Sequence, residues 1–251
     1  MPAPIRSLAA SAVARVCSLA PTPVRAASVF FGEDINSTGT TNANPQRIPQ
    51  PNADAAQEAF LALLTGVETE TFESSTGVVT SLTFGPDTAT LSPGLEVLTV
   101  PTDTFNGVYP ISGDNVLLQA VGAAESAFTI TFSTPQAAFG FYATDIESQG
   151  NLTLRFLLAD GLTTLDRPVP TQAGTGPAAN TGSVVYFGVI DTENPFLAVS
   201  FVRGLNQDDG FGFDDMTIGR VENVIPEPGT LALLGLGLAL TSAARRRSQL
   251  R

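Results

Sequence analysis

The sequence contains no histidine, lysine or tryptophan, and its only cysteine is Cys17. Without histidine the chain lacks the commonest general base and the commonest zinc ligand, and it cannot form a Ser-His-Asp or Cys-His catalytic set. Cys17 lies in the segment that we interpret below as a leader. We therefore expect neither a disulfide framework nor a thiolate metal site in the exported chain.

All twelve basic residues are arginine, against 24 acidic residues, and the formal charge is -12. The imbalance is concentrated in the middle of the chain, where residues 27–225 contain 23 acidic and five basic side chains. A surface of this sign repels phosphate backbones, so we expect no nucleic-acid partner. It suits an extracellular protein or one that binds divalent cations.

The C-terminal segment has three parts in a fixed order. Residues 224–229 form a proline-containing linker that resists both helix and central strand, because proline fixes φ and lacks an N–H group. Residues 230–244 are fifteen uncharged residues, about 22 Å of helix, shorter than the ~30 Å hydrocarbon core of a bilayer. The basic cluster that follows would lie on the cytoplasmic side. It comprises Arg245, Arg246 and Arg247.

This tail, about residues 224–247, resembles the PEP-CTERM sorting signal of bacterial exopolysaccharide-associated proteins. The resemblance implies recognition by a membrane protease of the exosortase class, with cleavage near the motif Pro226, Glu227 and Pro228. The apolar helix would then anchor the chain in the inner membrane only until processing. An ordinary C-terminal membrane anchor is the alternative. We assign residues 223–251 to this sorting signal.

The N-terminal residues 1–27 are interpreted as a leader, although a weak one. Arg6 can serve as the positive region and residues 7–14 as a short apolar region, but Arg15 interrupts the apolar run. Ala26 and Ala27 offer small residues for cleavage. The leader is either atypical or begins upstream of Met1.

Residues 28–222 are predicted to form one mainly β domain with a single soluble helix at about 53–64. Asp54 and Gln57 have the spacing of a capping box, and Gly66 is expected to end the helix. Its apolar face is formed by Phe60, Leu61 and Leu64.

After the helix the hydrophobic period changes from 3.6 to 2 residues, and the apolar runs are bounded by Gly, Pro, Asn or Asp. Many short alternating strands favour an antiparallel β-sandwich or jelly roll over an α/β fold. The predicted strands are 77–84, 95–100, 115–121, 127–133, 136–144, 152–156, 162–169, 183–190, 196–203 and 211–219.

Three segments, 30–34, 139–145 and 209–219, resemble parts of secreted PEP-CTERM proteins with an uncharacterised β domain. The last also resembles the closing strand of carbohydrate-binding jelly rolls, in which an Asp-Asp pair precedes an apolar strand end. These resemblances imply a β-sandwich fold.

An acidic cluster in the last of these segments is the best candidate for chemistry: Asp208, Asp209, Asp214 and Asp215. In an alternating strand only one of Asp214 and Asp215 can face inward, and a buried carboxylate needs a partner. Resemblance to calcium-bearing jelly rolls favours a structural Ca²⁺, with Glu33 or Asp34 completing its shell. The alternatives are pairing with Arg203, or aspartates that accept hydrogen bonds from backbone N–H groups in turns.

Asp145 and Glu147 could form the acid/base pair of a glycosidase, but a solvated loop is the preferred interpretation. A further group of aromatic residues could stack on sugars, although aromatics on strands more often form core. It comprises Phe30, Phe31, Phe139, Phe141, Tyr142, Phe211 and Phe213, and the exposure of Tyr109, Tyr142 and Tyr186 would decide between these interpretations.

The sequence thus predicts a non-enzymatic, exported protein at the cell surface or in the extracellular space. We expect it to have a structural or adhesive role in exopolysaccharide or biofilm. A carbohydrate-binding module of the jelly-roll type is the alternative, and a glycosidase-like hydrolase is a third.

Overall fold

The computed structural model describes residues 27–38, 45–120, 127–146, 152–172, 181–204 and 210–221. These residues form twelve strands and one helix. In chain order the elements are β1 (Ser28–Asp34), α1 (Pro51–Leu61), β2 (Leu64–Glu70), β3 (Gly77–Phe84), β4 (Asp87–Thr99), β5 (Asn115–Gln119), β6 (Ala127–Gln136), β7 (Ala138–Thr144), β8 (Leu152–Leu158), β9 (Thr164–Pro168), β10 (Val184–Ile190), β11 (Phe196–Arg203) and β12 (Phe211–Val221).

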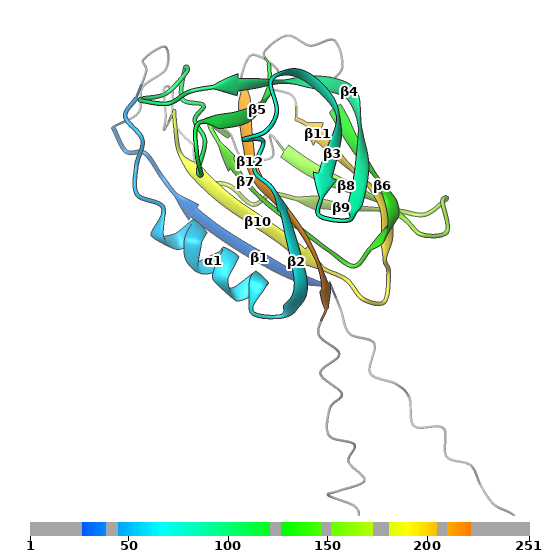
Figure 1. The fold of residues 1–251 in the computed structure, drawn as a ribbon. Helices are drawn as coiled ribbons and strands as arrows, with labels where there is room; N and C mark the ends of the chain where they lie inside the picture. The colour runs from blue at the N-terminus through cyan, green and yellow to red at the C-terminus, as the bar shows by residue number, and fades with distance from the viewer. Residues whose placement is uncertain are drawn as a thin grey trace, which may run out of the picture.

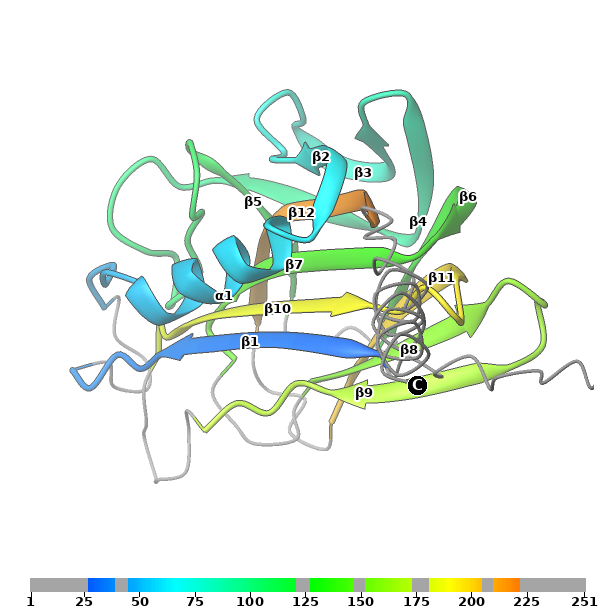
Figure 2. The same cartoon turned by 90° about the horizontal axis from the view of Figure 1, so that it is seen from below.

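The strands form one antiparallel sheet in the order β1-β10-β7-β12-β5-β4-β6-β11-β8-β9, with β2 also paired to β12 and β3 to β4. The sheet curls so that the β1-β10-β7-β12 half lies opposite the β6-β11-β8-β9 half (Figures 1 and 2). The predicted mainly β, antiparallel class is confirmed. The two layers of the sandwich belong to one continuous curled sheet.

Alternating side chains fill the space between the two halves. Along β6, Phe128, Ile130 and Phe132 are buried while the intervening threonines face outward. Phe201 of β11 stacks on Phe128 at 4.3 Å and meets Phe141 of β7 edge-on at 5.0 Å, both distances between ring centroids. Aromatic rings from both halves therefore interlock in one core.

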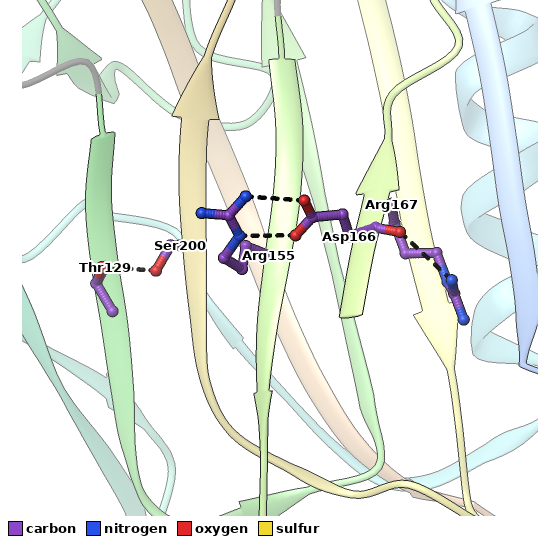
Figure 3. A network of polar contacts seen from close by, with 5 residues as sticks. All are labelled: Thr129, Arg155, Asp166, Arg167 and Ser200. Atoms are coloured by element: carbon purple, nitrogen blue, oxygen red, sulfur yellow. Dashed lines mark hydrogen bonds and ion pairs between the residues drawn. The ribbon is translucent and has the colours of Figure 1, made fainter. Parts of the chain in front are cut away.

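The outer face of the β6-β11-β8-β9 half carries polar pairs. The hydroxyl groups of Ser200 in β11 and Thr129 in β6 form a hydrogen bond of 2.8 Å. Arg155 donates two hydrogen bonds, of 2.7 and 2.8 Å, to the carboxylate of Asp166 (Figure 3). The guanidinium of Arg155 lowers the pKa of the Asp166 carboxyl. Because both side chains are about half exposed, this pair contributes little to stability.

Helix α1 covers the outer face of β1 and β10 (Figure 2). Its Phe60 is fully buried and packs on strand glycines, since a Cβ on Gly188 would lie 2.8 Å from the Phe60 ring. The Tyr142 hydroxyl donates to Asp54 of the helix at 2.8 Å. A second, smaller apolar cluster thus fixes the helix to the sheet.

The predicted helix bounds were wrong at both ends. The helix begins at Pro51, where proline needs no N–H partner, and Asp54 bonds to Tyr142 instead of forming a capping box. It ends at Leu61, three residues before the predicted end, because Leu64 already begins β2. Gly66 lies within β2 with a φ of +56° and does not cap the helix.

Apart from Ala27, the predicted leader, residues 1–27, lies outside the described residues, and so does the whole predicted sorting signal, residues 223–251. Within the described ranges, no helix is both long and apolar enough to cross a membrane.

Candidate functional site

Acidic side chains in the described residues act repeatedly as acceptors for backbone N–H groups. Asp34, at the end of β1, accepts from the backbone N–H groups of Asn52 and Ala53 at 3.0 and 2.9 Å. These N–H groups open α1 and have no partner inside the helix, so Asp34 caps the helix from 18 residues away in sequence. Glu33 accepts in the same way from the backbone N–H of Gln172 at 2.9 Å.

Asp214 and Asp215 lie at a β-bulge in β12. The register against β7 shifts between Asp214 and Thr217, and Asp215 has a φ of +47°. The extra residue sets Phe213 and Met216 in the main core and leaves both carboxylates on the other side of the strand. The expectation of strict alternation, with one aspartate facing inward, was therefore wrong.

On that side both carboxylates meet the segment before β5. Asp214 Oδ2 accepts from the backbone N–H groups of Ile111 and Ser112 at 2.7 and 3.0 Å. The Ser112 hydroxyl donates to Asp215 Oδ1 at 2.7 Å. The two aspartates thus fasten this segment to the sheet, which is the turn-stabilising role considered from the sequence. Arg203, the other partner considered, donates to the carbonyl of Ala120 at 3.2 Å and lies over the Phe211 ring.

The calcium hypothesis remains a prediction. Within the described ranges no three acidic side chains gather into a group that could hold a metal ion. Asp34 and Glu33 are engaged at α1 and at Gln172, and Asp208 and Asp209 lie outside the described residues.

Burial raises the pKa of Asp214 to about 8, and the charge of Asp215 acts in the same direction. Hydrogen bonds from the N–H groups of Ser112, Asp215 and Ile111 oppose the shift. Burial also raises the pKa of Asp215, against the hydrogen bond from Ser112.

The raised pKa of Asp214 predicts a pH-dependent stability. Between about pH 4, where the carboxyl ionises in the unfolded chain, and about pH 8 the native state holds the extra proton. Stability therefore falls as pH rises through this window. In EDTA, we expect the Tm to decrease from about pH 5 to about pH 8, and Asp214→Asn to remove much of that slope.

Asp160→Asn is the control, because the pKa of the exposed Asp160 is lowered by hydrogen bonds from Thr163 and Leu162 and its carboxyl stays ionised throughout. If the Tm of Asp214→Asn fell with rising pH as steeply as that of the unaltered chain, the assignment of the pH dependence to Asp214 would be contradicted. The same titration in millimolar calcium tests the calcium hypothesis, because a bound ion would hold the carboxylate ionised and abolish the slope.

The predicted acid/base pair is described only in part. Asp145 is buried, has a φ of +70°, and accepts the backbone N–H of Gly182 at 2.8 Å. Glu147 lies outside the described residues. The position of Asp145 is that of a buried structural acceptor, not of a solvated loop residue.

The aromatic residues considered for sugar stacking form core instead. Phe139, Phe141, Phe211, Phe213 and Tyr142 are each at most 1% exposed, and Phe30 and Phe31 are half-buried. Tyr109 and Tyr186 are at most 2% exposed. Burial raises the pKa of Tyr109 to about 12. The sugar-stacking hypothesis is therefore wrong for the buried residues, which form core as preferred from the sequence, whereas Phe30 and Phe31 are partly accessible.

One aromatic residue that sequence reasoning missed is exposed. Half of the Phe105 side chain (50%) is accessible, more than for any other aromatic residue among the described ranges. Phe105 lies in a short hairpin with a two-residue turn between β4 and β5. We term this hairpin, residues Thr104–Tyr109, the tip hairpin. Phe105 and Val108 exchange two backbone hydrogen bonds of 2.8 and 3.0 Å.

The tip hairpin is rigidly built. Asn106 and Gly107 both have positive φ, +51° and +92°, as in a type I′ turn, for which Asn-Gly is the preferred pair. The Thr104 hydroxyl donates to the carbonyl of Pro45 at 2.9 Å. Arg47 Nε donates to the carbonyl of Asp103 at 2.7 Å. The dipeptide Asn106-Gly107 was the sequence signal that could have located this hairpin.

Comparisons with known proteins locate one motif. Residues 224–247 match the PEP-CTERM protein-sorting motif. No curated protein matches the chain.

Solved structures with some similarity include the K2 cleaved adhesin domain of Lys-gingipain, at 15% identity, a TM-score of 0.41, and coverage of 61% of this chain and 98% of that chain. The CBM22-1 xylan-binding domain from Paenibacillus barcinonensis gives 15% identity, a TM-score of 0.34, and coverage of 62% and 94%. The C-terminal family 22 carbohydrate-binding module of Clostridium thermocellum Xyn10B gives 20% identity, a TM-score of 0.33, and coverage of 63% and 94%.

Proposed function

Because residues 224–247 carry the PEP-CTERM sorting motif of exported, exosortase-processed surface proteins, we propose that the β-sandwich is a non-catalytic adhesive module of the extracellular polysaccharide matrix. The sorting motif is the observation that carries this proposal. Exosortase, a membrane protease, is the processing partner. The inner membrane holds the chain only before processing.

The described part of the molecule supports a binding or structural role. Three buried carboxylates accept hydrogen bonds from backbone N–H groups at a helix end and in turns. They are those of Asp34, Asp145 and Asp214. Carboxylates held this way stabilise loops, and loops held on a rigid sandwich are typical places for recognition.

Sorting is tested in the producing cells by replacing Pro226, Glu227 and Pro228 together with alanine. We expect the unaltered chain at the surface or in the extracellular fraction, with intact mass showing loss of the apolar helix and of Arg245, Arg246 and Arg247. The triple variant should keep its tail and stay with the membrane fraction. A surface form of the unaltered chain that retains residues 230–251 would contradict the proposal, as would normal processing of the triple variant.

A further inference from the structure

The tip hairpin lies at the Phe211 end of β12, the end opposite Val221, which is the last described residue. The Tyr109 N–H donates to the Thr144 hydroxyl at the end of β7, and Tyr109 Oη donates to the carbonyl of Gly182 just before β10. The sorting motif follows Val221, at the opposite end of β12 from Phe211. With 11 residues in β12, the two ends are about 30 Å apart. Phe105 therefore lies at the opposite end of β12 from Val221.

The supports under the hairpin leave little conformational entropy to lose on binding. A Cβ on Gly107 would lie 2.1 Å from Asp145 Oδ1, so the turn rests directly on that buried side chain. Arg47 bonds to the carbonyls of Asp103 and Val100, in the segment between β4 and the hairpin, and lies 5.5 Å from the centre of the Tyr109 ring. The backbone that carries Phe105 is therefore preorganised for recognition.

Among the residues that the structure describes, those exposed beside Phe105 are polar or acidic. Thr102, Asp103 and Asn106 are exposed beside it. Arg47, the basic residue at the hairpin, is committed to two carbonyls. In a chain of net charge -12, such a site disfavours phosphates, anionic lipids and acidic polysaccharides.

A flat aromatic face bordered by hydroxyl, amide and carboxylate groups matches one class of ligand well. A pyranose ring has an apolar C–H face that can lie on Phe105 and a rim of hydroxyls that can bond to the polar neighbours. One ring is too small an area for a stable protein interface. A polymer repeats the same weak contact many times, and many copies of the chain on one polymer bind with avidity.

We propose that the tip hairpin is a contact site for a neutral polysaccharide, with a sugar ring stacked on Phe105. The site rests on the proposed matrix function and names its ligand class. It lies outside the sorting motif, and Phe105 is not one of the core aromatic residues.

The test is affinity electrophoresis of the full chain, purified in a mild non-ionic detergent. The probe is extracellular polysaccharide extracted from the producing cells and separated by anion exchange into a neutral and an anionic fraction. We expect the neutral fraction to retard the unaltered chain. Phe105→Ala should bind about tenfold more weakly, since the aromatic contact is lost.

Three variants sharpen the result. Phe105→Leu keeps an apolar side chain but loses the π face, and it should bind as weakly as Phe105→Ala. Phe105→Tyr should bind like the unaltered chain. Leu162→Ala is the matched control, because Leu162 is 87% exposed in the turn between β8 and β9, and its loss should change nothing.

The proposal is overturned if the neutral fraction does not retard the unaltered chain, or if Phe105→Ala or Phe105→Leu binds as the unaltered chain does. Retardation by the anionic fraction alone, or flotation of the chain with phosphatidylglycerol vesicles through Phe105, would also overturn it. Export and cleavage of the chain are measured separately from sugar binding. If the chain is exported and cleaved but does not bind sugar, only the proposed site at Phe105 is contradicted, and the proposed function is not.

Discussion

Replacing Gly32 with alanine is expected to destabilise the domain by about 3 kcal/mol, the upper part of the range for overpacking a rigid site. A Cβ on Gly32 would lie 2.0 Å from the carbonyl oxygen of Asn52 and 2.9 Å from the Cα of Ala53. Both are backbone atoms of the first turn of α1. The helix must move away from β1, and the cap from Asp34 to Asn52 and Ala53 is strained at the same time.

Urea unfolding followed by circular dichroism measures this effect. Gly219→Ala is the matched control, because it is also a strand glycine without positive φ, and its nearest neighbours are side-chain atoms of Leu64, the closest at 2.9 Å. A side chain can move where a backbone cannot, so we expect a clearly smaller loss. Equal losses in the two variants would show that α1 does not pack on β1 as described.

Replacing Phe201 with alanine is expected to cost about 3–5 kcal/mol, the usual range for removing a buried phenylalanine. Phe201 is fully buried, and its ring centroid lies 5.0 Å from the ring centroids of Phe141 and Phe213. Both of these residues come from the opposite half of the sheet. Phe201→Ala would leave a cavity between the two layers of the sheet. The backbone of the strands on both sides limits how far the surrounding residues can move to fill it.

The control for Phe201→Ala is Val202→Ala, one residue along β11 and half-buried on the other side. We expect that change to cost less than about 1 kcal/mol, because little area leaves water there. Equilibrium unfolding in urea, monitored by tyrosine fluorescence, compares the two. A loss in Phe201→Ala no larger than in Val202→Ala would contradict the curled-sheet core.

Strands with regular alternation could be predicted from the sequence. The predicted strand 77–84 matches β3, and 196–203 matches β11. The period of two is visible in part of each strand, at Leu82 and Phe84 of β3 and from Val199 to Arg203 of β11. β1 was not predicted as a strand, since two adjacent phenylalanines and Gly32 show no alternation. β4 begins at Asp87, eight residues before its predicted start, because Pro93 and Gly94 suggest a loop.

The candidate sites depended on contacts between distant residues and were harder to predict. The expectation that Asp34 completes a calcium shell could not take account of its partners Asn52 and Ala53, which become its neighbours only when α1 folds back on β1. The bulge at Asp215 breaks the alternation on which the assignment of Asp214 rested. Phe105 could not be told from core phenylalanines by composition, since its exposure is set by the tip hairpin.

The measurement that tests the central claim most directly is the share of the processed chain that sediments with the polysaccharide matrix of the producing cells. We predict that the unaltered chain and Leu162→Ala lose their C-terminal tail and sediment with the matrix. Phe105→Ala should lose its tail equally but appear in the culture medium. Processed, unaltered chain found free in the medium, or Phe105→Ala retained in the matrix like the unaltered chain, would contradict the account.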